Sequence, residues 1–100
     1  MKEVGFQVVR PDGGFENVNV LVADVERLIA ELALFGDDAS MQRSRKLARD
    51  LYDKIEEDEL TAVQVSAEHR DDVFMALDRI GMRSGLSDAL AELRRVCAPQ

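Results

Sequence analysis

The sequence predicts one α+β domain, in which a small antiparallel sheet of three strands packs with about four α-helices in the order ββααβαα. Apolar residues alternate near the N-terminus and then recur every three or four positions, which indicates strands followed by helices. Apolar residues make up 46% of the chain, yet only five are aromatic and none is Trp, so the core consists mainly of aliphatic side chains. A length of 100 residues suits a single compact domain spanning 1–100.

A β-hairpin is predicted at the N-terminus, with strands at residues 6–10 and 16–22. Between them, Pro11 presets φ for a turn, Asp12 tolerates the next corner and Gly13 accepts positive φ. The second strand carries valines on one face and asparagines on the other: Val18, Val20 and Val22 against Asn17 and Asn19. This alternation is typical of a sheet that is wet on one side.

Two helices are expected to follow the hairpin. The first is capped by Asp24, ends at Gly36 and has an apolar face of Val25, Leu28, Ile29, Leu32 and Phe35. The second covers about 39–57, with Asp37, Asp38 and Ser40 as candidate caps. Its predicted inner face consists of Met41, Ser44, Leu47, Ala48, Leu51, Tyr52 and Ile55.

The last part of the chain predicts a strand over 60–66 and two more helices. Ser66 is placed to cap the first of these helices and Gly81 to end it, and its apolar arc is Val73, Phe74, Ala76, Leu77 and Ile80. Ser84 or Ser87 caps the final helix, whose apolar stripe is Leu86, Leu90, Leu93 and Cys97. The third strand can join either strand of the hairpin, and the sequence leaves this choice open.

The dominant feature is an acidic run over residues 50–72, with nine carboxylates against the two bases Lys54 and Arg70. Its net charge of −7 equals that of the whole chain. In the helix over 39–57 the bases come first and the acids last, which opposes the helix dipole. A segment that breaks a local rule without visible compensation is a candidate for function.

The candidate partner-binding residues are Asp50, Asp53, Glu56, Glu57, Asp58, Glu59, Glu68, Asp71, Asp72 and Met75. Steps of 100° per residue place Asp50, Asp53 and Glu57 on one outward stripe. The acids from 68 to 72 fall early in their helix, where the dipole favours negative charge, so they also have a structural explanation. Met75 points away from the apolar arc and suits an adaptable contact. Both one continuous acidic surface and two separate patches are compatible with the sequence.

Other chemistries find little support in the sequence. The acidic balance disfavours direct binding to nucleic acid or to an anionic membrane, and the bases of MQRSRKLAR are followed by acids on the same stripe. His69 is expected to be solvated and Cys97 to be packed, so no catalytic residue, cofactor or metal site is predicted and the protein is not expected to be an enzyme. A single cysteine and the lack of an apolar leader indicate the cytoplasm.

By size, charge and build, including the hairpin MKEVGFQVVRPDGGFENV, the chain resembles the small acidic anti-CRISPR proteins of phages, among them the type I-F inhibitors of the Csy surveillance complex. The resemblance implies binding to Cas subunits that blocks the capture of target DNA in the host bacterial cytoplasm. It carries no shared motif and assigns no residue. One alternative is an immunity protein or antitoxin that caps a nuclease toxin. Another is an oligomerising scaffold domain, if the stripe of Leu86, Leu90 and Leu93 is exposed.

Overall fold

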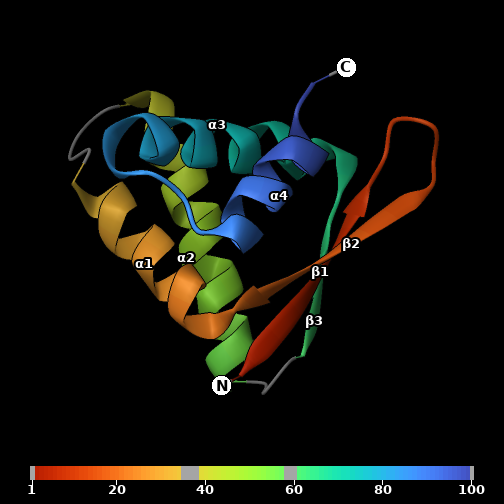
Figure 1. Ribbon diagram of the computed structural model, residues 1–100, viewed down its shortest axis with the longest axis horizontal. Helices are drawn as coiled ribbons and strands as arrows, with labels where there is room; N and C mark the ends of the chain where they lie inside the picture. Colours follow the sequence, from red (N-terminus) through yellow and green to blue (C-terminus); the bar gives the residue numbers. More distant parts are fainter. Residues whose placement is uncertain (1, 35–38, 58–60, 100) are drawn as a thin grey trace.

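The computed structural model describes residues 2–34, 39–57 and 61–99. Its elements are strands β1 (Glu3–Val9) and β2 (Phe15–Leu21), helices α1 (Val22–Ala33) and α2 (Gln42–Glu57), strand β3 (Ala62–Val65), and helices α3 (Ala67–Ser84) and α4 (Asp88–Cys97). One 3-10 turn, Ala39–Met41, precedes α2. The predicted α+β fold and its element order are therefore confirmed (Figure 1).

The sheet has the strand order β2-β1-β3 and is mixed. β1 pairs with β2 in antiparallel register, with Phe6 opposite Val18, but it pairs with β3 in parallel register, with Phe6 opposite Val63. The expectation of an antiparallel third strand was wrong. Helices α1 and α2 return the chain to the start of β1, where the Gly5 N–H donates to the Thr61 carbonyl at 2.8 Å, and such a long crossover permits parallel pairing.

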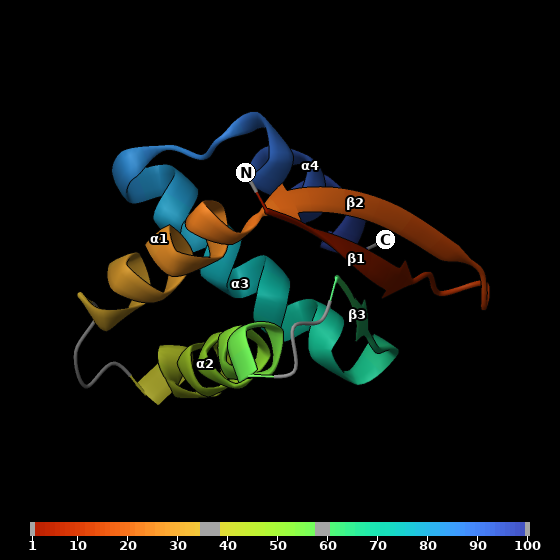
Figure 2. The ribbon, with the colours of Figure 1, turned by 90° about the horizontal axis from the view of Figure 1, so that it is seen from below.

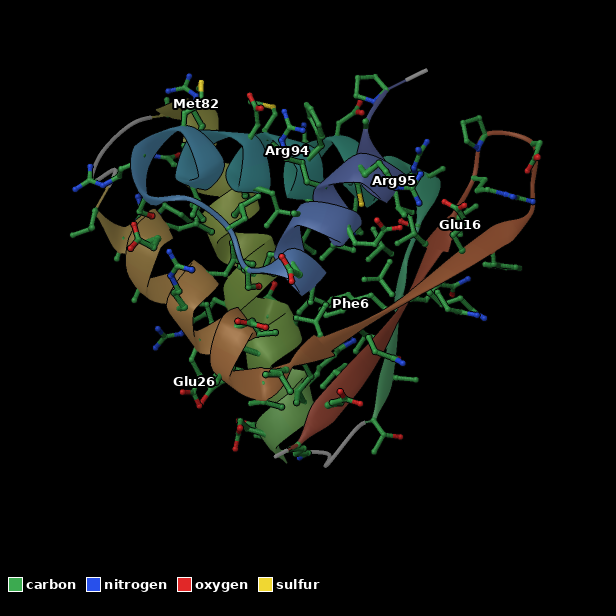
Figure 3. All side chains as sticks on the ribbon, viewed as in Figure 1. Phe6, Glu16, Glu26, Met82, Arg94 and Arg95 are labelled. Carbon is green, nitrogen blue, oxygen red and sulfur yellow. The ribbon has the colours of Figure 1, made fainter. Side chains whose placement is uncertain are left out.

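One face of the sheet is buried against the helices, and the other is open to solvent. The buried side chains are Val4, Phe6, Val8, Val18, Val20, Val63 and Val65. Phe6 points from β1 toward the helices (Figure 3). Asn17 and Asn19 are exposed on the open face, as the alternation of the second strand predicts.

The turn of the hairpin uses the predicted residues. Gly13 has φ of 90°, a value that glycine adopts without steric cost. The Arg10 N–H donates to the Gly14 carbonyl at 2.7 Å, and the Asp12 carboxylate accepts from the Gly14 N–H at 2.8 Å. The hairpin tip projects beyond the helices (Figure 1).

Helix α3 lies at the centre of the helical layer, with α2 on one side and α1 and α4 on the other (Figure 2). Its Val73, Leu77 and Ile80 are buried, as predicted. The stripe of α4 is core too, because Leu90, Leu93 and Cys97 are buried and Leu86 packs half-buried against them. The scaffold alternative required this stripe to be exposed, and that requirement is not met.

Several helix ends differ from expectation. α1 begins directly after β2, at Val22, so Asp24 lies in its first turn and does not cap it. α3 continues past Gly81 to Ser84, and Gly85, with φ of 80°, ends it. Ser87 caps α4 as predicted, accepting from the Leu90 N–H at 3.3 Å. The expected roles of Phe35, Gly36, Asp37, Asp38 and Leu60, and of the Ser40 side chain, lie outside what the structure describes.

No helix among the described residues is long and apolar enough to cross a membrane.

Candidate functional site

The acidic half of α2, defined here as Asp50, Asp53, Glu56 and Glu57, projects from the helix core into solvent. The opposite side of α2 is held by buried Ser44, Ala48 and Ile55, and the Ser44 hydroxyl donates to the Asp72 carbonyl at 2.7 Å. Because one face of a helix is buried, the residues on the other face must point outward. All four carboxylates are exposed, as predicted. Asp58 and Glu59 fall outside the described residues.

Within the described part of the chain, the acidic half of α2 forms no ion pair. Its charge nevertheless acts on Tyr52 of the same helix. The Tyr52 hydroxyl donates to Glu26 Oε1 of α1 at 3.0 Å, and this hydrogen bond is the main reason that the pKa of Tyr52 is raised above 10.0. Partial burial adds to this, followed by the negative charges of Glu26, Glu56 and Asp53. The acidic half thus has no ion-pair partner among the residues that the structure describes, and two of its carboxylates, Glu56 and Asp53, help to raise the pKa of Tyr52.

A hollow of about 460 Å³ lies beside the acidic half, between α2 and the start of α3. Its lining comes from three elements and consists of Leu47, Asp50, Leu51, Asp53, Lys54, Gln64, Val65 and His69. The lining combines apolar side chains with two carboxylates and one base, Lys54, so its acids outnumber its bases. It therefore suits a side chain that has an apolar stem and a positive end, such as Lys or Arg.

His69 differs from its predicted solvated state. Its side chain is half-buried where it lines the hollow, and its Nδ1 is buried without a hydrogen-bond partner in the described structure. The packing of α2 and β3 around the first turn of α3 covers the ring, which the local sequence does not reveal. The described residues contain no group of three or more His, Cys, Asp or Glu side chains that could hold a metal ion.

The acids at the start of α3 divide into two kinds. Glu68 and Asp71 are exposed, whereas the Asp72 side chain is only 13% exposed. Asp72 pairs with Arg43 of α2, with 3.2 Å between its Oδ2 and the guanidinium Nη2. The ion pair makes Asp72 part of the contact between α2 and α3. Neither Glu68 nor Asp71 lines the hollow, so the structure does not merge the two acidic clusters there.

Arg70 was counted among the bases of the acidic run, but it is buried, with 8% of its surface exposed. Its Nη2 donates to the carbonyls of Val96 at 3.1 Å and Ala98 at 3.3 Å, at the C-terminal end of α4. A cation at this end of a helix is favoured by the dipole. The sequence does hold a signal for this role, because Arg70 is three and seven residues before the buried Val73 and Leu77. With Arg70 buried, Lys54 is the only surface base of the run.

Met75 is exposed as predicted, at 38%, and Met82, one heptad later on α3, is exposed at 74% (Figure 3). Met82 was not predicted as a contact residue. Neither methionine lines the hollow beside the acidic half of α2. Asp78 lies between the two methionines in the sequence and pairs with Arg94 of α4 at 2.6 Å. The Arg94 guanidinium also covers the Phe74 ring, at 5.0 Å from its centroid.

Cys97 is fully buried, and burial raises the pKa of its thiol to about 11. The thiol therefore stays protonated and unreactive at neutral pH, which agrees with the packing role predicted for it.

Comparison with protein-family models, with curated proteins and with solved structures finds no match.

Proposed function

We propose that the protein is a stoichiometric inhibitor that binds another protein through the acidic half of α2. The partner presents a basic surface that otherwise binds nucleic acid. Carboxylates take the place of phosphates opposite Lys and Arg side chains, and the opposite charges accelerate the encounter. The inhibitor acts by occupying this surface and needs no catalytic residue or cofactor.

One observation carries the proposal: the acidic half of α2 is exposed and unpaired among the described residues, at the helix end where the dipole disfavours negative charge. Asp72 supplies the contrast, because its carboxylate already has a partner within the fold. The hollow beside Asp50 and Asp53 supports the same function, since it offers an apolar wall and two carboxylates to a Lys or Arg of the partner.

Among nucleic-acid-binding partners, the resemblance to small acidic anti-CRISPR proteins favours Cas subunits of the type I-F Csy complex. We propose that binding there blocks the capture of target DNA. The nuclease of a toxin system has a similar basic surface, so an immunity protein would use the same carboxylates.

The test uses the purified Csy complex and a target DNA duplex in a mobility-shift assay. The wild-type protein should prevent the DNA shift, and Asp53→Lys/Glu57→Lys should lose this effect. Glu3→Lys/Asp88→Lys is the matched control, because it makes the same change of net charge at exposed acids outside α2. It should inhibit like the wild type.

Two results would overturn parts of the proposal separately. If the wild-type protein leaves DNA capture unchanged, the Csy complex is not the partner. A pull-down from nuclease-treated bacterial lysate, comparing wild type with Asp53→Lys/Glu57→Lys, then tests the wider proposal. Capture of the same protein by both baits would show that the acidic half of α2 does not bind it.

A further inference from the structure

The exposed face of α2 carries positive charge on its first half and negative charge on its second. The basic half, defined here as Arg43, Lys46 and Arg49, is exposed like the acidic half that follows it, although Arg43 also pairs with Asp72 of α3 within the chain. Lys46 and Arg49 border a second hollow of about 460 Å³, which lies between α1 and α2. The hollow beside the acidic half lies on the other flank of α2, toward α3, so the two halves share the exposed face of the helix but border different hollows.

These charges are aligned along the helix. At 100° per residue, Arg43, Lys46, Asp50, Asp53 and Glu57 lie on one stripe. Seen in Figure 2, α2 forms an outer edge of the molecule, and the other labelled elements lie on one side of it. The stripe is thus accessible along its length and complementary in charge to a reversed copy of itself.

We infer that α2 is a docking surface for a second copy of this chain, in which the two α2 helices run antiparallel about a two-fold axis. An axis that crosses α2 between Arg49 and Asp50 places Lys46 opposite Asp53 of the partner subunit. It also brings Arg43 next to Glu57 of the partner subunit. Symmetry makes each of these contacts twice, as in any isologous interface.

The antiparallel arrangement also accounts for the order of charges within α2. In one chain the bases lie at the positive end of the helix dipole and the acids at the negative end, and both placements are unfavourable. In the pair, each charged half faces the opposite charge and the opposite end of the partner helix. The face lacks a large apolar side chain, so the dimer is held by charge and weakens as salt is added.

Sedimentation equilibrium at low ionic strength tests the dimer. The wild type should dimerise with increasing concentration, and added salt should reverse this. Lys46→Asp and Asp53→Lys should each raise the dissociation constant by about tenfold or more, because each places like charges opposite one another twice. The exposed Lys2 lies outside α2, so Lys2→Asp is the control with the same charge change as Lys46→Asp and should dimerise normally.

The charge swap is the decisive variant. Lys46→Asp/Asp53→Lys restores opposite charges in the antiparallel pair and should dimerise again. An equal mixture of the two single variants should form a heterodimer, since one chain then carries two acids at these positions and the other two bases. A wild type that stays monomeric at low ionic strength, or a swap that fails to restore the dimer, would overturn the inference.

Self-association covers the same carboxylates that the proposed inhibitor uses, but the two ideas fail separately. Lys46→Asp leaves every acid of α2 in place, so it should lose the dimer and retain inhibition of DNA capture. Asp53→Lys should weaken both. A monomeric wild type that still inhibits would reject the dimer alone, and a dimer without inhibition would reject the inhibitor alone.

Discussion

The end of α2 and the start of α3 are both rich in acid, yet their carboxylates differ in what surrounds them. Those of α3 stand near the positive end of a helix dipole, and Asp72 pairs with Arg43 across the helix contact. Those of α2 stand near the negative end and have no described ion-pair partner. The bases differ too, because Arg70 is buried against α4 and Lys54 is exposed. Composition alone therefore does not separate structural charge from charge that is available for binding.

The largest effect on stability is expected from the bases. Arg70→Ala removes two charge-assisted hydrogen bonds from the end of α4 and should lower the free energy of unfolding by about 2–4 kcal/mol. Lys54→Ala should change it by less than about 0.5 kcal/mol. Urea denaturation measures both variants. Equal effects would mean that burial of Arg70 does not distinguish the two regions.

Smaller effects on stability are expected from one acid of each region, and the two effects should have opposite signs. Aspartate is replaced by asparagine in both variants because these two residues have nearly the same helix propensity. Asp72→Asn loses the ion pair with Arg43 and should destabilise the fold by about 0.2–1 kcal/mol. Asp53→Asn removes a charge from the negative end of α2 and should stabilise the fold by about 0.3–1 kcal/mol. Thermal unfolding of the two variants gives the signs. If both destabilise, the dipole argument for α2 is wrong.

The smallest effect concerns the titration of Tyr52. Because Tyr52 is the only tyrosine of the chain, the absorbance of tyrosinate measures its ionisation without interference from other residues. Its midpoint should lie above 10.0, because Glu26 accepts its hydrogen bond. Glu26→Gln should lower the midpoint most, and Asp53→Asn should lower it less. The raised pKa adds stability below the unfolded pKa of tyrosine, and this stability is lost as the pH rises through the folded pKa. Tyr52→Phe should therefore unfold with a flatter pH profile in that alkaline range.

Much of the fold follows from local patterns. Pro11 to Gly14 form the turn that their chemistry demands, the alternating valines line the inner face of the sheet, and Ser87 caps the helix that follows it. Each of these depends on neighbours within a few residues. The outward direction of Asp50, Asp53 and Glu57 was also predictable, because the apolar residues of α2 fix which side is buried.

Most of the features that were predicted wrongly depend on contacts between distant segments. The parallel pairing of β3 follows from the path of two helices, and the half-buried state of His69 follows from the packing of α2 and β3 around α3. Gly81 resembles a helix end but continues the helix, since Gly85 supplies the positive φ four residues later. Asp72 and Arg70 found partners on α2 and α4 that no local window contains.

The sequence by itself determined the element order, the inner faces of the helices and an acid-rich segment that opposes its own helix dipole, because these depend on periodicity and on charge order along the chain. Only the tertiary structure decided which of those charges are available. It buried Arg70, paired Asp72 and left the acidic half of α2 exposed, since burial and ion pairing depend on which helices pack together.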